Sequence, residues 1–299
     1  MAGKKPINNS QLLTPSILSA INNIVSFGNF DLRNYASTYL IRINAVGEQL
    51  EFYIKDAIAN SFNLSHEKRE NSYARVFSYL GNQNNPPDMI IKNGDAFEIK
   101  KIENQKSSLA LNSSPPKDKL LATDERITNA CRNCEPDPWA EKDLFYVVGH
   151  VNGGKIKYLF FIQGTCYAAD HTIYQKIHDP IKKEVDSIID SLGLEKGETI
   201  EIGKVKKVDP LGITELRIRG MWQIQNPLKV YENFCKIEND KKVYLFALMT
   251  KEKYNSYPDV HRNNLEKIVE NNFSINDIKI KSPNNPAKLL DAKLIKFSK

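Results

Sequence analysis

Two acids and a lysine lie within one apolar stretch of this sequence, Pro87-Asp88-Met89-Ile90-Ile91-Lys92-Asn93-Gly94-Asp95-Ala96-Phe97-Glu98-Ile99-Lys100. The stretch predicts two strands around an Asn-Gly turn, with Asp88 at the start of the first and Glu98 and Lys100 in the second. Carboxylate oxygens suit Mg²⁺, which can polarise a phosphoryl oxygen and activate water. A nearby lysine adds positive charge for the attacking water or the phosphate. These residue types suit metal-assisted phosphodiester hydrolysis.

The hairpin loop decides whether the three side chains can meet. Residues i and i+2 of a strand share a face, so Glu98 and Lys100 point the same way. A two-residue loop would place Asp88 opposite Ile99, on the wrong face, whereas a three-residue loop over residues 93–95 would place it opposite Lys100. A working site therefore predicts the longer loop, or a bend or bulge at Asp88.

Neighbouring charges on the hairpin have a simpler explanation. An ordinary hairpin carries acids and lysines on its solvated face, and we expect this for Asp95, Lys101 and Glu103, which the alternation places away from the site. The strands around Asp88 and Glu98 are apolar enough to be buried, so charges there need a reason. The balance favours a nuclease over a solvated hairpin.

Longer strings in the chain resemble a known family. Pro87-Asp88 with Glu98-Ile99-Lys100 resembles the core of the PD-(D/E)xK nuclease superfamily. The strings that resemble the NgoPII-type group of type II restriction endonucleases are Tyr79-Leu80-Gly81-Asn82, Asn85-Pro86-Pro87-Asp88, Glu98-Ile99-Lys100-Lys101-Ile102-Glu103, Ala110-Leu111-Asn112-Ser113-Ser114, Asp209-Pro210-Leu211-Gly212-Ile213-Thr214 and Arg217-Ile218-Arg219-Gly220-Met221-Trp222. The resemblance, from about residue 44 to about residue 231, implies Mg²⁺-dependent cleavage of double-stranded DNA at a short palindrome. It suggests the site GGCC and products with 3′-hydroxyl and 5′-phosphate ends.

A glutamate outside the hairpin is a further candidate. Glu48 lies at the head of a predicted helix, and in the superfamily a glutamate from such a helix reaches the same metal, so Glu48 joins Asp88 and Glu98 as an expected catalytic residue and metal ligand. The alternative is that Glu48 favours the positive end of the helix dipole.

Two stretches are candidates for contact with DNA. Arg217 and Arg219 share one face of a predicted strand, and arginine reads guanine in the major groove. The alternative partners for both are phosphates or acids such as Glu215. Asn112, Ser113 and Lys117 follow the catalytic strand and are expected to contact the DNA backbone or a groove, although a plain turn would have the same composition.

Composition sets broad limits. The chain has 299 residues, 41% hydrophobic and 26% charged, which describes an ordinary globular protein. A net charge of +6 permits a phosphate-backbone partner without requiring one. No apolar run or signal core indicates a membrane, so the cytoplasm is the expected location. Cys131 and Cys134 have CxxC spacing but lack a second ligand pair, so we interpret them as reduced, unligated cysteines.

The predicted fold is α/β, with a central mixed β-sheet flanked by helices. Helices are expected at 11–27, 46–62, 73–80, 174–192 and 265–271, with a short one near 124–131 in the long polar segment 104–137. Strands are expected at 143–150, 155–162 and 243–249, besides the hairpin. We expect one restriction-endonuclease-like domain over 1–299, with a helical N-terminal extension (1–43) and a C-terminal subregion (232–299).

The predicted function is that of a homodimeric type II restriction endonuclease, because a palindrome mirrors a two-fold axis. Double-stranded DNA would be the substrate and Mg²⁺ the cofactor, with a DNA methyltransferase expected in the host but not as a stable partner. One alternative is a structure-selective repair or junction nuclease of the same superfamily. The other is a DNA-binding protein without catalysis, against which the intact acids and lysine argue.

Overall fold

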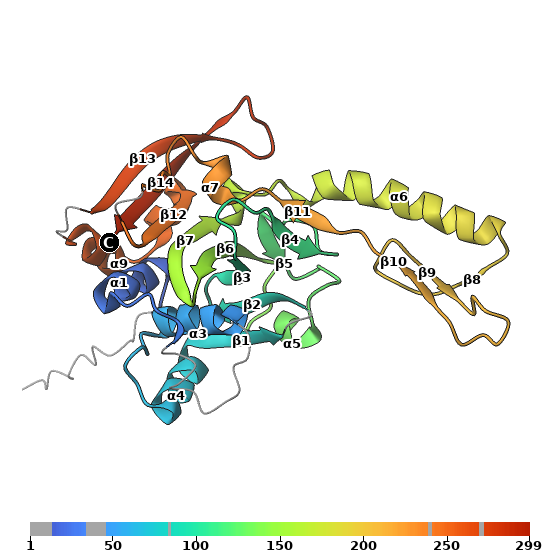
Figure 1. Cartoon of the computed structure of the whole chain (residues 1–299), viewed down its shortest axis with the longest axis horizontal. Coiled ribbons are helices and arrows are strands. Elements are labelled where there is room, and N and C mark those ends of the chain that lie inside the picture. The colour runs from blue at the N-terminus through green and yellow to red at the C-terminus, as the bar shows by residue number, and fades with distance from the viewer. Residues whose placement is uncertain (1–13, 34–45, 83–84, 239–240, 269–271) are drawn as a thin grey trace, which may run out of the picture.

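A large mixed β-sheet forms the centre of the molecule (Figure 1). The computed structural model describes residues 14–33, 46–82, 85–238, 241–268 and 272–299. Within them the strand order is β1 (Phe77–Asn82), β2 (Asn85–Ile91), β3 (Ala96–Ile102), β6 (Glu141–Asn152), β7 (Lys155–Gln163), β12 (Tyr244–Thr250), β14 (Leu289–Ser298) and β13 (Phe273–Lys281). β3 with β6 and β7 with β12 are parallel, and the other neighbours along this path are antiparallel. With helices against the sheet, the predicted α/β class is confirmed.

Alternate side chains along the central strands point to opposite faces of the sheet, and each face carries a hydrophobic core. In β12, Leu245 and Ala247 enter one core, while Phe246 and Leu248 enter the other. Every residue of β12 except the last is buried, as expected of a strand covered on both faces. In β3, however, Glu98 and Lys100 alternate with buried apolar residues, which leaves two charges on a largely buried strand.

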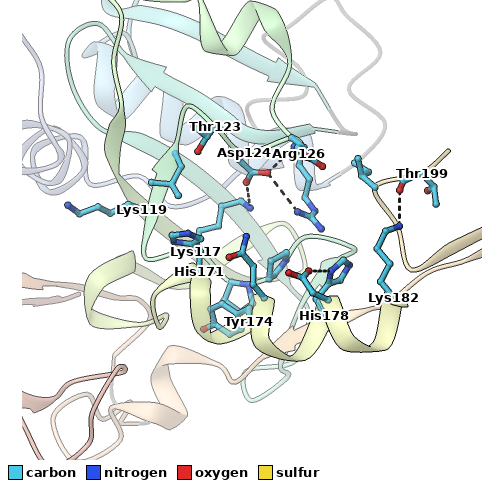
Figure 2. Close-up of a pocket in the computed structure, with 17 residues that line it drawn as sticks. Lys117, Lys119, Thr123, Asp124, Arg126, His171, Tyr174, His178, Lys182 and Thr199 are labelled. Atoms are coloured by element: carbon cyan, nitrogen blue, oxygen red, sulfur yellow. Dashed lines mark hydrogen bonds and ion pairs between the residues drawn. The ribbon is translucent and has the colours of Figure 1, made fainter. Parts of the chain in front are cut away.

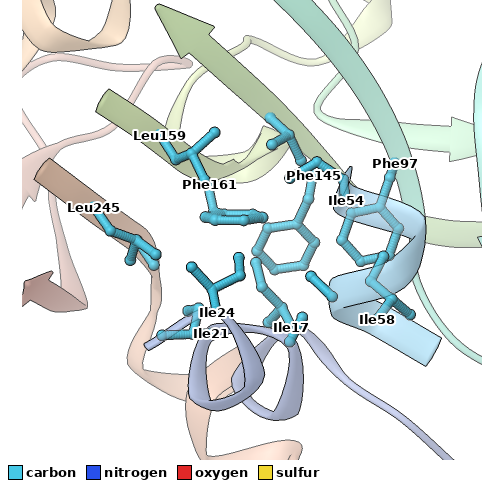
Figure 3. Close-up of a cluster of buried hydrophobic side chains, with 14 of the residues drawn as sticks. Ile17, Ile21, Ile24, Ile54, Ile58, Phe97, Phe145, Leu159, Phe161 and Leu245 are labelled. Atoms are coloured by element: carbon cyan, nitrogen blue, oxygen red, sulfur yellow. The ribbon is translucent and has the colours of Figure 1, made fainter. Parts of the chain in front are cut away.

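The first core lies beneath α1 (Ile17–Phe27) and α3 (Val46–Ala59), with α9 (Asp259–Glu266) against α1 and α4 (His66–Val76) beside α3. Figure 3 shows Ile17, Ile21 and Ile24 of α1 facing Phe145 and Phe161 of the sheet. A capping box at Ser16 starts α1, and Gly28, at φ 63°, ends it. The helical spacing of these apolar residues and the two caps therefore position α1 against the sheet.

The second face carries shorter elements. β4 (Leu109–Asn112) pairs with β11 (Trp222–Ile224), and β5 (Lys119–Leu121) pairs with β6. α5 (Asn129–Arg132), the 3₁₀ turn Gly164–Cys166 and α7 (Pro227–Val230) complete this layer, while α8 (Lys251–Ser256) follows β12. The hairpin charges lie on this side of β3.

An arm extends from the second face, at the right of Figure 1. We define the arm as residues 171–221, which contain α6 (His171–Ser191) and a small sheet of β8 (Glu195–Lys196), β9 (Gly203–Lys206) and β10 (Leu216–Ile218). α6 contacts β9, and both Ile189 of α6 and Val205 of β9 are 3% exposed. The arm returns to the body through β11, which pairs with β4.

The element predictions had mixed outcomes. The long helix in the arm, the 46–62 helix and the strands at 143–150, 155–162 and 243–249 are confirmed within a few residues. The helix predicted at 73–80 is wrong, because α4 ends at Val76 and Phe77 begins β1. The helix predicted at 265–271 lies instead at Asp259–Glu266, because it starts directly after Pro258. Residues 269–271 of that prediction, and residues 11–13 of the first predicted helix, lie outside the described residues. The segment 104–137 holds two short strands besides its helix.

The two expected flanking subregions contribute to the centre of the molecule. α1, from the expected N-terminal extension, supplies six buried side chains to the first core. β12, β13 and β14, from the expected C-terminal subregion, form one side of the main sheet. No helix within the described part of the chain is long and apolar enough to cross a bilayer.

Candidate active site

The hairpin between β2 and β3 closes with a loop of residues 92–94. Ile90 pairs with Ala96, and the N–H of Ile91 donates to the carbonyl of Asp95 at 3.0 Å. This confirms the predicted three-residue loop, although it begins one residue earlier than expected. Asn93 accommodates the turn with a positive φ of 53°, a conformation that asparagine tolerates better than most residues.

The observed register brings Asp88 to the face that a site requires. Continued from the paired residues, it places Asp88 opposite Glu98 rather than Lys100. Asp88 Oδ2 accepts a hydrogen bond from the backbone N–H of Ile99 at 2.5 Å. From β1, Gly81 approaches so closely that a Cβ there would lie 2.2 Å from the carbonyl oxygen of Pro87 and 3.2 Å from Asp88 Cα. Backbone contacts on both sides therefore position Asp88.

Glu98 and Lys100 form an ion pair beside Asp88. Lys100 Nζ lies 2.6 Å from Glu98 Oε1, and the Lys100 and Glu98 side chains are 24% and 14% exposed. Lys101 instead pairs with Glu103 at 2.7 Å, where Glu103 is 82% exposed. The predicted alternation is confirmed, with Lys100 at the acid cluster and Lys101 on the opposite face of β3.

The three charges perturb one another. Burial, followed by the negative charge of Glu98, raises the pKa of Asp88 to about 7, although the hydrogen bond from Ile99 and the charge of Lys100 act in the opposite direction. Burial alone would lower the pKa of Lys100, but the charge and hydrogen bond of Glu98 raise it. An acid that titrates near neutrality beside a second carboxylate is an arrangement found at functional sites.

A hard divalent cation fits these groups. Glu98 Oε2 is buried and has no hydrogen-bond partner within the described structure, so an acceptor oxygen is left over after Lys100 has bonded Oε1. A cation between Asp88 and Glu98 would satisfy that oxygen and relieve the repulsion that raises the Asp88 pKa. The donor set is two carboxylates, because no group of three His, Cys, Asp or Glu side chains in the described residues gathers as a metal site.

The predicted helix glutamate, Glu48, lies in the first turn of α3 and is half-buried. The charge of Glu51, from the same helix, also raises the Asp88 pKa, and Glu51 pairs with Lys55 at 2.6 Å. Glu48 and Glu51 are three residues apart and so lie on one side of the helix. The sequence analysis missed Glu51, although this spacing was a usable signal.

The two predicted DNA-contact stretches lie side by side. Trp222 of β11 is opposite Asn112 of β4, and Ser113 lines a cavity of about 200 Å³ together with Trp222 and Glu201. The ammonium group of Lys117, whose contact with DNA stays a prediction, is 2.6 Å from Asp124, and only 10% of its side chain is exposed. Asn112 and Ser113 thus lie beside the arm, and Lys117 is held inside the fold.

Glu201 organises the two arginines. Arg219 Nε lies 2.6 Å and Arg217 Nη2 lies 3.0 Å from the same Glu201 oxygen, and Arg217 Nε donates to the other at 3.1 Å. Glu201 is 7% exposed, whereas the arginine side chains are more than half exposed. The suggested acid partner, Glu215, pairs with Lys204 instead, at 2.8 Å. No local pattern pointed to Glu201, because β9–β10 pairing brings it to the arginines.

Two cavities lie beside the loop that follows β4. A space of about 20 Å³, enough for one water, is lined by Glu98, Ser114, Lys117 and Tyr146. On the other side of Lys117 a cavity of about 420 Å³ separates the body from α6 (Figure 2). Its basic lining residues are Lys117, Lys119, Arg126, His171, His178 and Lys182. The linings of the two cavities share Pro115 and Lys117, so the 112–117 loop lies between the acid cluster and the space beside α6.

Comparison with known proteins gives a consistent result. A model of the NgoPII restriction endonuclease family matches residues 15–281. The chain belongs to this family. The type II restriction enzyme NgoPII of Neisseria gonorrhoeae is 45% identical over 260 residues, which are 86% of this chain and 90% of that enzyme. No solved structure matches the chain. The family, the enzyme class and the restriction-endonuclease function expected from the resemblance are confirmed.

One expectation about the hairpin is wrong. Asp95 is not a solvated turn residue; it is 5% exposed and lies 2.5 Å from Lys253 Nζ. Tyr257 donates a hydrogen bond to its second oxygen at 2.6 Å, and Lys253 also pairs with Asp143 at 2.7 Å. Asp95 thus anchors the family hairpin to α8. Its partners are 158 and 162 residues away, so no local pattern could reveal them.

Proposed function

We propose that this member of the NgoPII family makes Mg²⁺-dependent double-strand cuts at a short palindromic DNA site, with GGCC as the first sequence to test. The observation that carries the proposal is the cluster of Asp88, Glu98 and Lys100, with its raised Asp88 pKa and its unsatisfied Glu98 oxygen. Family membership supports DNA as the substrate.

Each member of the cluster has a distinct role in this proposal. Asp88 and Glu98 hold the cation, which would supply positive charge to the scissile phosphate. Lys100, 2.6 Å from Glu98, donates a hydrogen bond to the attacking water or to a phosphate oxygen and stabilises charge that develops there. Glu51, rather than Glu48 alone, adds negative charge from α3. In-line attack by water requires no covalent intermediate with the protein.

DNA contacts are proposed for the arginines of the arm and the loop beside them. Arg217 and Arg219 are more than half exposed, and their shared bond to Glu201 restrains both guanidinium groups. A single guanidinium can donate to both O6 and N7 of a guanine. Asn112 and Ser113 contact the sugar-phosphate backbone in this proposal. Lys117, bonded to Asp124, supports the loop from within and contributes less than the sequence suggested.

The experiment is digestion of unmethylated DNA with and without Mg²⁺, followed by sequencing of the fragment ends. Discrete fragments that share one short palindrome support the proposal. Nicks or cuts that follow DNA structure instead of sequence would favour the repair-type nuclease. Tight DNA binding without cleavage in Mg²⁺ or Mn²⁺ would favour a non-catalytic protein. Lys100→Ala should lower the cleavage rate by roughly 10²–10³-fold, and Lys101→Ala is the matched control on the opposite face.

A further inference from the structure

The cavity of about 420 Å³ beside α6 has two walls that come from different parts of the chain. One wall consists of residues between 115 and 126 of the body, and the other consists of α6 with Thr199 and Ile200 of the arm. Figure 2 shows Arg126 projecting from the body toward α6, and His178 and Lys182 projecting from the helix into the same space. The volume is in the range of ligand-binding sites.

Hydrogen-bond donors follow one face of α6 along this cavity. His171, Gln175, His178 and Lys182 line it at spacings of four, three and four residues, so they lie on one side of the helix. Asp179 is the acid of α6 that also lines the cavity, and its carboxylate lies 3.1 Å from the ring of His178. The helix therefore presents mainly donors to the space.

Lys182 carries a positive charge that has no acidic partner within the described residues. Its ammonium group donates to the backbone carbonyls of Thr199 at 2.9 Å and Glu201 at 2.7 Å. The carboxylate of Glu201 is bonded to the two arginines of the arm instead. An ammonium group has three donors, so Lys182 keeps one donor and its full charge for a ligand.

Arg126, on the opposite wall, also has unused donors. Its guanidinium group donates no hydrogen bond to any described residue, and Nη1 lies 3.8 Å from Asp124, which is too far for one. Asp124 is bonded to Lys117 at 2.6 Å, so one carboxylate faces two cations. The Arg126 side chain is 21% exposed. A guanidinium group in this state suits the oxygens of a phosphate group, which match its planar fork.

The cavity lies between the acid cluster and the arginines of the arm. It shares Pro115 and Lys117 with the small cavity that Glu98 lines. It shares His178 and Ile200 with the cavity of about 200 Å³ at the carboxylate that binds the two arginines. A DNA strand that reached from the acid cluster to the arginines would therefore pass this cavity with its phosphodiester backbone.

We propose that the cavity binds a backbone phosphate of the DNA substrate between Arg126 of the body and Lys182 of α6. The identity of the ligand rests on the proposed function. A phosphate contact of this kind positions the duplex and carries no sequence information. Because Lys182 also binds the backbone of Glu201, the same contact orients the arginines of the arm relative to the strand.

The test is the salt dependence of DNA binding by the full chain, measured by fluorescence anisotropy without divalent cations so that no strand is cut. Two labelled duplexes are compared, one with a central GGCC and one with that site scrambled. Between about 50 and 200 mM salt, Arg126→Gln and Lys182→Gln should each reduce the slope of log K against log salt by about 0.9. Each should weaken binding by roughly tenfold at 0.1 M salt, equally for both duplexes.

Two matched variants separate a phosphate contact from general charge and from folding. Lys183→Gln removes the next lysine of α6, which is exposed and does not line the cavity, and it should leave the slope unchanged. Arg126→Lys keeps the charge and should keep the slope. Arg126→Gln is the decisive loss, because this guanidinium group has no hydrogen bond in the described structure whose removal would disturb the fold.

Three results would overturn the inference. They are an unchanged slope for Arg126→Gln and Lys182→Gln, an equal fall for Lys183→Gln, and a loss of affinity confined to the GGCC duplex. Calorimetry with pyrophosphate separates the DNA backbone from a free anion. If pyrophosphate binds the wild type but not the double variant, and the slopes on DNA are unchanged, the cavity takes a free phosphate compound and the assignment to DNA is wrong.

Plasmid cleavage separates this inference from the proposed function. A wild type that binds duplex DNA with the expected slopes but cuts none would refute the nuclease proposal and leave the phosphate site. A wild type that cuts at one palindrome, with slopes that neither Arg126→Gln nor Lys182→Gln changes, would refute the phosphate site alone.

Discussion

Replacement of Asp88 by asparagine should make the metal-free protein more stable while it abolishes cleavage. The asparagine side chain would resemble the protonated carboxyl group, and its amide oxygen can still accept the hydrogen bond from the N–H of Ile99. The substitution removes the burial of a charge and the repulsion with Glu98, which together raise the Asp88 pKa to about 7. Functional sites commonly carry such a stability cost.

The expected size follows from the pKa. A rise from 3.8 to about 7 is roughly three units, or about 4 kcal/mol of destabilisation once the carboxyl is fully ionised. Because the folded state binds this proton more tightly than the unfolded state, the cost is absent below about pH 4 and grows through pH 5 and 6. It is complete above about pH 7. Asp88→Asn should therefore match the wild type near pH 4 and exceed it by up to about 4 kcal/mol at pH 8, which is on the order of 8 °C in Tm.

The assay is thermal unfolding of both proteins from pH 4 to pH 8, without and with Mg²⁺. Mg²⁺ should raise the Tm of the wild type most at pH 8 and have little effect on Asp88→Asn, because binding favours the folded state. Asp137→Asn, at an exposed carboxyl group, is the control and should show no such trend. Equal Tm values at all pH values, or a less stable Asp88→Asn at pH 8, would refute the account of the acid pair.

Three further predictions concern the hairpin and its supports. Lys100→Ala should lower the single-turnover cleavage rate by roughly 10²–10³-fold, and Lys101→Ala by no more than a few-fold; equal losses would contradict the assignment of faces. Gly81→Ala should reduce cleavage by ~100-fold, because a Cβ 2.2 Å from the Pro87 carbonyl oxygen must displace the backbone beside Asp88. A misplacement of about 1 Å in a catalytic group has an effect of this size. An unchanged rate would show that Gly81 does not position Asp88. Asp95→Ala should lower the free energy of unfolding in urea by roughly 3 kcal/mol, since it removes one of the two acids that pair with the buried Lys253. An unchanged stability would mean that Asp143 alone compensates the charge of Lys253.

Local patterns predicted the hairpin well. Alternation separated Lys100 from Lys101, and the need for Asp88 to face Glu98 predicted a three-residue loop. The loop position was wrong by one residue, because Asn-Gly signals a turn without fixing which residues close it. The residue opposite Asp88 changed by two positions, from Lys100 to Glu98, and an even shift of register keeps a side chain on the same face of the sheet. Asp88 therefore lies on the predicted face despite this error.

Long-range partners were beyond sequence reasoning. Asp95 was expected to be solvated. Its partners, however, come from α8 and the residue that follows α8, which are far from Asp95 in the sequence. The ion pair of Lys117 with Asp124 was likewise not expected from the sequence. In both cases the residue type and its local spacing were clear from the sequence. They did not reveal the oppositely charged side chain that would lie beside the residue in the fold. Burial of a charge depends on such partners more than on its neighbours in the chain.

The arrangement of the molecule separates the acid cluster from the arm. Asp88, Glu98 and Lys100 depend on the main sheet, where backbone contacts from Gly81 and Ile99 fix their positions. Arg217 and Arg219 depend on Glu201 within the arm, which joins the body through the pairing of β11 with β4. Substitutions of exposed residues on α6, such as Ile177→Glu, should therefore leave the pH dependence of Asp88 unchanged. A shift in that pH dependence caused by Ile177→Glu would mean that the arm and the acid cluster are energetically coupled, and the two would then have to be treated as one site.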